Sequence, residues 1–228
     1  MKKNIGVLLS GCGVYDGSEI HEAVFTLLAI EMNGGNSICI APDSLQHHVI
    51  NHISGEEMNE SRNVMVEAAR IARGNINNLS TVQVEDLDAL VIPGGFGAAK
   101  NLTNWAIQGA GGFIYPDVKR IIVDMHALGK PLVGLCMGPT VIAKAFENSG
   151  VSIQLTVGTT KEQSPYDISA ISAGMEQLGA VVEMCSVREI AVDIPHRVIT
   201  APCYMMDATI ADVQRNTDQS ISRLFEFL

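Results

Sequence analysis

The sequence predicts a flavodoxin-like α/β fold, with a doubly wound, mainly parallel sheet and helices on both faces. Short apolar, β-branched runs alternate with longer helical patterns along most of the 228 residues. This alternation is typical of successive βαβ units, whose parallel strands are buried on both faces. In such sheets ligands bind beyond the carboxyl ends of the strands, so the strand ends are where function is expected.

Each element follows from its local pattern. The apolar runs predict strands at Ile5–Leu9, Ser37–Ile40, Ala89–Ile92, Leu132–Leu135 and Gln154–Val157. The helical patterns predict helices at Glu19–Met32, Arg62–Arg73, Asp117–Leu128, Pro139–Asn148, Ile168–Leu178 and Asp207–Phe227. Ser18 is the predicted N-cap of the first helix. Val181–Pro202 contains two short β runs around a turn at Pro195-His196, which predict antiparallel strands at a sheet edge. We find no repeat or linker and expect one domain, residues 1–228.

Composition excludes several classes of function. The formal net charge of −10 argues against nucleic acid or an anionic membrane surface as a partner. No apolar run approaches the roughly 20 residues of a membrane span, and the opening Ile5–Leu9 is too short for a secretory signal. The five cysteines are scattered and form no C-x-x-C pair, so we expect no metal site, no disulfide framework and a reducing, cytoplasmic compartment.

The most informative run is Pro131–Thr140, where a short apolar strand ends at Cys136 and a helix starts at once. Such a turn pushes the side chain out of the sheet and points the first helical amides toward it. Helix N-termini lower thiol pKa values, so the pattern favours a reactive thiolate. The alternative is a buried core thiol, which is common for free cysteine.

Two other features belong to the same predicted edge. Gly94 and Gly95 follow the strand Ala89–Ile92, and their amides, with that of Met137, would form an oxyanion hole. A tight turn that needs glycine explains them equally well. Glu22, inside the first helix, is the candidate proton partner of the thiol, although acids near a helix start are usually solvated.

Other motifs give weaker evidence of function. The glycine-rich loop Ser10–Ser18 lacks G-x-G-x-x-G and no Walker A run occurs, so we expect no nucleotide or other cofactor. His21 points about 100° away from Glu22 around the helix and would line the rim of a cavity at most. No His-x-Glu follows Cys136, and His196 stands before a strand with no acid two residues on. A Cys-His-Glu glutaminase triad is therefore not visible.

Four stretches together resemble the ElbB family, amidotransferase-like proteins of the ThiJ/PfpI superfamily: Gly11–Val24, Asn63–Gly74, Val91–Leu102 and Thr200–Met205. The resemblance runs from end to end of the chain. It implies a flavodoxin-like fold of the class I glutamine amidotransferase type, a nucleophile elbow at Cys136 and a hydrogen-bonded acid at Glu22. It further implies a cofactor-independent glyoxalase and an indirect link to isoprenoid biosynthesis.

The sequence departs from the family pattern at two places. Many superfamily relatives supply a histidine after the elbow helix, whereas the corresponding segment, Gln154–Thr159, has none. The elbow reads Cys136-Met-Gly-Pro, where the ElbB family usually has Ile-Ala-Pro after the cysteine. The first departure argues against peptidase and glutaminase activity, and the second predicts a reshaped pocket at Met137.

The leading hypothesis is conversion of glyoxal or methylglyoxal to glycolate or lactate. Cys136 would add to the aldehyde, the three amides would hold the oxyanion, and Glu22, with a pKa raised by burial, would move a proton. Two alternatives stay open: a redox-sensing or protective protein in which a low-pKa Cys136 is oxidised, and a glutaminase-like subunit. By analogy with superfamily relatives we expect a homodimer that binds a small reactive dicarbonyl.

Overall fold

The computed structural model describes residues 2–228. Its main sheet has seven strands in the order β3-β2-β1-β4-β5-β9-β8. All neighbours pair in parallel except β8 and β9. The run β2-β1-β4-β5-β9 has the flavodoxin-like order, so the fold class predicted from the sequence is confirmed. The strands are β1 (Asn4–Leu8), β2 (Asn36–Ala41), β3 (Asn77–Asn78), β4 (Ala89–Ile92), β5 (Leu132–Leu135), β8 (Ala191–Asp193) and β9 (Val198–Ala201).

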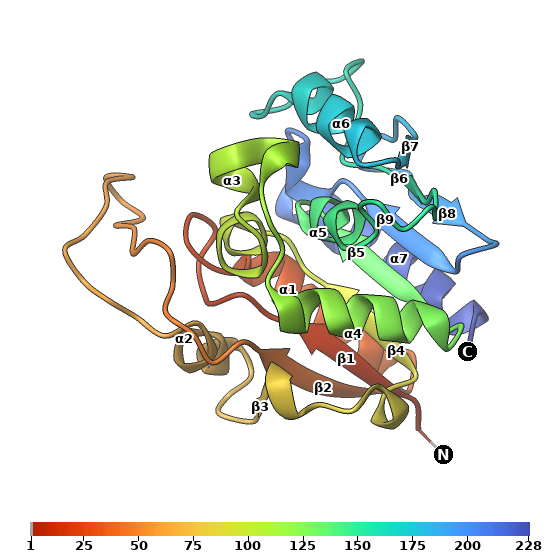
Figure 1. Cartoon of the computed structure of the whole chain (residues 1–228), viewed down its shortest axis with the longest axis horizontal. Helices are drawn as coiled ribbons and strands as arrows, with labels where there is room; N and C mark the ends of the chain where they lie inside the picture. Colours follow the sequence, from red (N-terminus) through yellow and green to blue (C-terminus); the bar gives the residue numbers. More distant parts are fainter. Residues whose placement is uncertain (1) are drawn as a thin grey trace.

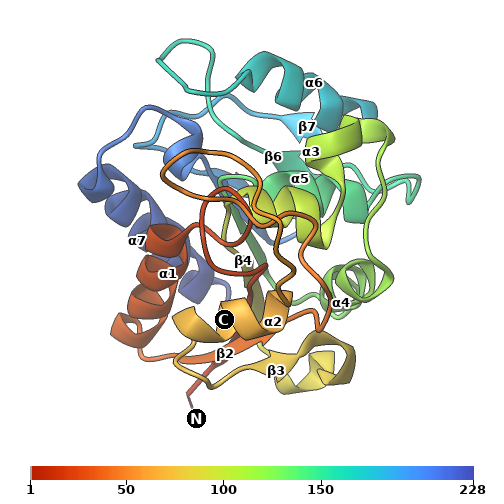
Figure 2. The same cartoon turned by 90° about the vertical axis from the view of Figure 1, so that its left-hand side faces the viewer.

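Helices cover the sheet on both faces (Figures 1 and 2). On one face α1 (Ile20–Met32) packs against α7 (Ile210–Glu226), and on the other α4 (Pro116–Ala127) packs against α5 (Gly138–Ala145). The remaining helices are α2 (Val64–Ile71), α3 (Trp105–Gln108) and α6 (Ile168–Gln177). Side chains from both layers and from the sheet bury together in one hydrophobic cluster. Among residues 2–228, no helix combines the length and the apolar character that crossing a bilayer requires.

Two predicted strands, β4 and β5, match residue for residue, but Gln154–Val157 does not. Only β6 (Gln154–Leu155) forms there, and it pairs with β7 (Val181–Val182) in a separate two-stranded sheet. Side-chain oxygens accept hydrogen bonds from the backbone N–H groups that a longer strand would use for pairing. The Gln154 N–H donates to Asp193 Oδ2 at 2.8 Å, and the Thr156 N–H donates to Thr200 Oγ1 at 2.8 Å.

The two β runs predicted in Val181–Pro202 correspond to β8 and β9. Strand β8 is the antiparallel edge strand that the sequence predicted. Strand β9 is not at the edge, because it pairs in parallel with β5 inside the sheet. Its end therefore adjoins the end of the Cys136 strand, which the local pattern did not reveal.

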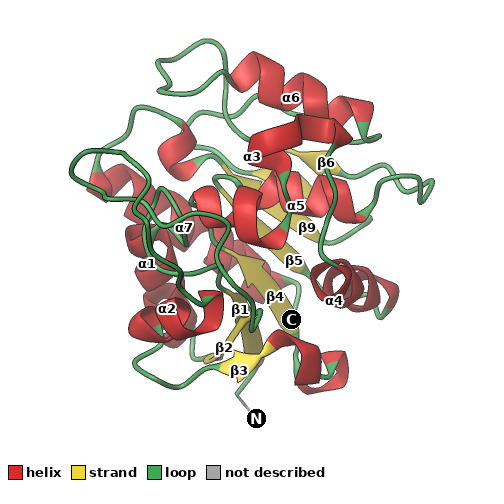
Figure 3. Cartoon of the chain, turned by 60° about the vertical axis from the view of Figure 1, so that its left-hand side comes forward, coloured by secondary structure: helices red, strands yellow, loops and turns green. Residues whose placement is uncertain are grey.

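The carboxyl ends of β1 and β4 meet, as predicted. The backbone of the loop after β4 binds the backbone of the glycine-rich loop after β1, with Phe96 N to Val14 O at 2.7 Å and Gly97 N to Gly17 O at 2.8 Å. Figure 3 turns this edge forward and shows loops crossing over the strand ends. A longer segment, residues 42–63, projects away from the body beside them (Figure 1).

Candidate active site

Cys136 directly follows β5 and has a left-handed backbone, with φ of +55°. This conformation is uncommon for a residue with a side chain and marks local strain. The Cys136 N–H donates to Ala201 O at 2.9 Å, which continues the pairing of β5 with β9. A Cβ on Gly138, two residues on, would lie 2.4 Å from Ile92 O, so the turn into α5 needs glycine there. The sharp strand-to-helix turn predicted from the sequence is present.

Glu22 reaches the thiol from α1. Its side chain is fully buried, and its Oε2 lies close to the thiol: a Cβ built on Gly94 would lie 2.6 Å from Glu22 Oε2 and 2.8 Å from Cys136 Sγ. Two backbone amides fix the carboxyl: Gly94 N–H donates to Oε2 at 2.9 Å, and Tyr204 N–H donates to Oε1 at 3.3 Å. The structure therefore places this carboxyl next to the thiol, while their catalytic pairing stays a prediction. The Tyr204 donor comes from the loop after β9.

A second carboxyl group lies next to Glu22. Helix α1 is capped by Glu19, whose Oε2 accepts from Glu22 N–H at 2.8 Å. The predicted cap, Ser18, is wrong because its hydroxyl accepts from Ser10 N–H at 2.9 Å and holds the glycine-rich loop instead. Glu19 is itself buried, so its charge acts on Glu22 through little water.

Burial controls the ionisation of Glu22 and Cys136. It raises the pKa of Glu22 to about 8, with a further upward contribution from the charge of Glu19. This confirms the expected raised pKa of the carboxyl. Burial and the nearby Glu22 also raise the pKa of Cys136 well above its ordinary value, although the Gly95 N–H lowers it. The predicted low pKa of the thiol is therefore wrong in this arrangement: the cost of desolvating a thiolate exceeds the stabilisation from the helix N-terminus.

The three amides predicted to hold an oxyanion differ in their partners. Gly94 N–H is occupied by Glu22, which makes it a support of the carboxyl rather than an oxyanion donor here. The Gly95 N–H favours the ionised sulfur of Cys136 and lowers its pKa, and Met137 is the N-cap of α5. A Cβ on Gly94 would lie 2.4 Å from the Cβ of Cys136 and 2.6 Å from Glu22 Oε2, so only glycine fits between the pair.

Comparisons with known proteins identify the family of the chain. The chain is 36% identical to the mitochondrial ES1 protein homolog of Rattus norvegicus, over 99% of this chain and 84% of that protein. It is 36% identical to the human mitochondrial glutamine amidotransferase-like class 1 domain-containing protein 3, over 97% and 82%. A crystal structure of an isoprenoid biosynthesis protein with an amidotransferase-like domain from Ehrlichia chaffeensis superimposes with a TM-score of 0.89, at 30% identity and 99% coverage of both chains. This chain belongs to the ES1/ElbB family.

Two more distant solved structures share the fold of this ES1/ElbB protein. A ThiJ/PfpI domain protein from Brachyspira murdochii gives a TM-score of 0.55 at 14% identity, and Drosophila melanogaster DJ-1beta gives 0.54 at 13%. At these identities the likeness concerns the fold alone. No family model matches the chain. The mammalian relatives carry the word mitochondrial in their names, whereas the cytoplasmic compartment of this chain stays a prediction.

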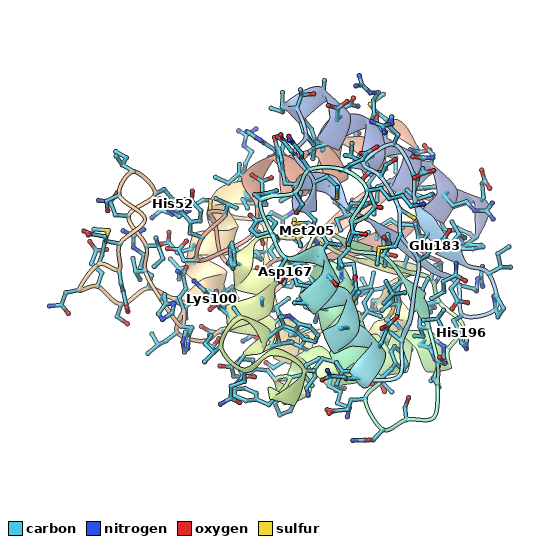
Figure 4. The ribbon with its side chains drawn as sticks, turned by 90° about the horizontal axis from the view of Figure 1, so that it is seen from above. His52, Lys100, Asp167, Glu183, His196 and Met205 are labelled. Atoms are coloured by element: carbon cyan, nitrogen blue, oxygen red, sulfur yellow. The ribbon has the colours of Figure 1, made fainter. Side chains whose placement is uncertain are left out.

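Histidine is not part of the described site of this family member. None of its six histidines hydrogen-bonds to Cys136 or Glu22 within residues 2–228. Figure 4 shows His52 and His196 at opposite ends of the molecule. His21 lies on α1, the helix that carries Glu22. Its Nδ1 lies 2.9 Å from the Tyr204 hydroxyl, at the rim of a cavity, as the sequence predicted.

That cavity adjoins the buried pair and has a volume of about 770 Å³. Its lining includes Glu19, His21, Tyr166 and Tyr204. Glu19 and Tyr204 touch Glu22 directly, through the N–H groups described above. Cys136 itself is 5% exposed and is not among the residues that line the cavity, so Glu19 and Tyr204 stand between the cavity and the buried pair.

Sequence reasoning missed three residues here: Glu19, Tyr166 and Tyr204. Tyr204 lies within Thr200–Met205, one of the stretches that carried the family resemblance, so a signal for it existed. Burial raises the pKa of the Tyr166 phenol to about 12, with smaller upward contributions from the neighbouring Cys136 and Glu22. Tyr166 lies in an irregular loop before α6 and had no local signal. No cluster of three or more metal-ligating side chains occurs among residues 2–228.

Proposed function

We propose that this protein is a cofactor-independent glyoxalase that converts 1,2-dicarbonyls such as methylglyoxal to hydroxy acids. The observation that carries the proposal is one buried unit: a strained cysteine next to a carboxyl with a pKa of about 8, beside a cavity. A base whose pKa lies near the operating pH is well matched to moving protons at both a thiol and a carbon.

In the first step the Cys136 sulfur attacks the aldehyde carbon C1. The ionised carboxyl of Glu22 takes the thiol proton as the S–C bond forms, so no free thiolate is needed. This accounts for a thiol whose pKa is raised well above its ordinary value. The oxyanion at C1 would be held by the amides of Gly95 and Met137 and then takes the proton back from Glu22, giving a hemithioacetal.

In the second step Glu22 removes the proton from C1 and delivers it to C2 through an enediol. C1 is oxidised to the level of a thioester while C2 is reduced from ketone to alcohol, so no external oxidant or reductant is required. Water then hydrolyses the thioester and restores the thiol. The net reaction adds one water to methylglyoxal and gives lactate, or adds one water to glyoxal and gives glycolate.

The test is lactate formation from methylglyoxal by the reduced, purified protein. Turnover that is lost in Cys136→Ala and in Glu22→Gln, and kept in Cys39→Ala, supports the proposal. Cys39 is a matched control because it is a buried cysteine on β2. Absence of lactate from the folded, unmodified protein would overturn the glyoxalase proposal.

The two alternatives are less favoured. Oxidation of cysteine follows thiolate character and exposure, and Cys136 is 5% exposed with a raised pKa, which disfavours redox sensing. A glutaminase would need a histidine that the described site lacks. Selective oxidation of Cys136 by dilute peroxide in a protein without turnover would reverse this ranking. The homodimer stays a prediction, and its test is the mass of the protein in solution.

A further inference from the structure

The cavity is much larger than the simplest dicarbonyls. A volume of about 770 Å³ falls in the range of roughly 300–1,000 Å³ that is usual for ligands of drug size. A three-carbon dicarbonyl is only a few times the size of a water molecule, whose share of liquid volume is about 30 Å³. Most of the cavity would stay empty around methylglyoxal, so the space fits a substrate with a larger second end.

Tyrosine is concentrated around this space. The chain has four tyrosines, and three of them line the cavity: Tyr15, Tyr166 and Tyr204. They come from three separate segments, namely the glycine-rich loop, the loop before α6 and the turn after β9. Aromatic side chains make up only 5% of the sequence, so this gathering is a property of the site and not of the composition.

The charged groups of the lining are acidic. Glu19 and Asp207 line the cavity, no lysine or arginine is among its lining residues, and His21 is its one basic side chain. The Lys100 ammonium lies outside the lining, where it donates to Tyr15 O at 2.9 Å and sits 5.4 Å from the centre of the Phe96 ring. Burial is the main cause of the raised pKa values of Tyr166 and Tyr204, and the carboxyl groups of Glu19 and Glu22 add to both, which places these carboxyls near the two phenols.

Rings and carboxylates of this kind favour one class of ligand. The faces of aromatic rings attract cations, and rings grouped around a space bind ammonium and quaternary ammonium groups. Carboxylates add Coulomb attraction, which is stronger in a partly desolvated site than in water. An anionic substrate would be repelled, and a neutral one would gain nothing from the charges.

We propose that the cavity binds the ammonium end of an aldehyde substrate, with the aldehyde carbon at Cys136 and the cation among Tyr15, Tyr166, Tyr204 and the carboxylates of Glu19 and Asp207. This rests on the proposed function for the fate of the aldehyde but not for the binding of the cation. The preferred substrates are then 1,2-dicarbonyls that carry an ammonium group, and methylglyoxal is a poor, truncated analogue of them.

Isothermal titration calorimetry tests the cation site without any chemistry. Choline and its neutral isostere 3,3-dimethylbutan-1-ol are titrated into the full-length, reduced protein. We expect choline to bind at least about 10-fold more tightly, which corresponds to about 1.4 kcal/mol. Equal binding of the two probes, or no binding of choline, would overturn the proposal.

Matched variants locate the binding. Asp207→Asn should lower the affinity for choline several-fold, whereas Asp124→Asn, which removes the same charge from α4 on a different part of the molecule, should leave it unchanged. Tyr166→Phe keeps an aromatic face and should keep the preference for choline, whereas Tyr166→Leu should lose it. The same loss in Phe and Leu variants would assign the preference to the hydroxyl and contradict binding by the ring.

A second probe pair separates this inference from the proposed function. Betaine aldehyde and 3,3-dimethylbutanal have the same shape and differ in charge, and both can form a hemithioacetal at Cys136 but cannot rearrange. Betaine aldehyde should inhibit methylglyoxal turnover at least about 10-fold more strongly. Turnover with equal inhibition would overturn the cation site alone. Choline preference without any turnover would overturn the glyoxalase alone.

Discussion

Two cysteines at neighbouring strand ends, Cys136 and Cys203, have nearly the same backbone and very different surroundings. Cys136 follows β5 with φ of +55°, and Cys203 follows β9 with φ of +47°. Both are buried, and burial raises both thiol pKa values well above the ordinary value. At Cys136 the sulfur meets a carboxyl group and an amide, while at Cys203 it lies 3.8 Å from the Thr217 hydroxyl.

The difference shows that strain and burial do not by themselves make a nucleophile. A buried thiol needs a group that takes its proton, and a hydroxyl with an ordinary pKa cannot do this at neutral pH. Cys203 has its backbone N–H held by Asn216 Oδ1 at 3.0 Å, which points to a structural role in joining β9 to α7. The charge of Glu22 raises the pKa of both thiols, so what sets Cys136 apart is the side-chain contact of its sulfur with that carboxyl.

The largest expected effect is the contrast between the two cysteines themselves. Cys136→Ala removes the attacking atom and should lower turnover of methylglyoxal by about 10³-fold or more. Cys203→Ala should keep turnover within a few-fold and lose only some stability from the cavity it leaves. Lactate assays on both variants, with circular dichroism as the folding control, check this. Similar losses in the two variants would mean that the comparison is wrong.

The next effect concerns the proton partner. Because Glu22 must be ionised to accept the thiol proton, kcat/KM should rise with pH and level off above about 8, the pKa to which burial raises this carboxyl. Glu22→Gln should lower turnover by about 10²–10⁴-fold, the usual contribution of a general acid–base. The pH profile of kcat/KM measures both. If the rise in kcat/KM near pH 8 persists in Glu22→Gln, another group is responsible for it.

The same carboxyl should make stability depend on pH. Its pKa rises from 4.5 to about 8 in the folded chain, so the native state binds more protons than the unfolded state between these values. The free energy of unfolding should therefore fall as pH rises from 4.5 to 8, by up to about 5 kcal/mol, and then stay constant. Urea unfolding across this range should show the slope in the unmodified protein and a smaller slope in Glu22→Gln. Equal slopes would contradict a strongly shifted Glu22.

A smaller effect is expected from the glycine between the pair. Gly94→Ala would place a Cβ 2.4 Å from Cys136 Cβ and should cost about 1–3 kcal/mol of stability while separating the thiol from the carboxyl. Gly111→Ala is the control, because a Cβ there meets nothing within 4 Å. Urea denaturation and lactate assays compare the two variants. Normal turnover in Gly94→Ala would show that the pair does not need this close approach.

The local sequence was sufficient to predict much of the fold and the proximity of Glu22 to Cys136. Apolar runs between helical patterns determined the fold class and the bounds of β4 and β5, because strand and helix periodicity is a local property. The abrupt end of a strand at Cys136 determined the elbow. Strands of a parallel sheet end at one edge, which is why Glu22, Gly94 and Cys136 could be placed together in advance.

Only the tertiary structure decided the chemistry of that edge. The place of β9 beside β5 brings Tyr204 to Glu22, across 182 residues of sequence, and no local pattern sets which strand pairs with which. Glu19 caps α1 because the Ser18 hydroxyl accepts from the Ser10 N–H in the glycine-rich loop instead. The raised pKa values of Cys136 and Glu22 follow from how much water the packed loops exclude. Desolvation is a property of the whole assembled site, so residue types and spacing cannot supply it.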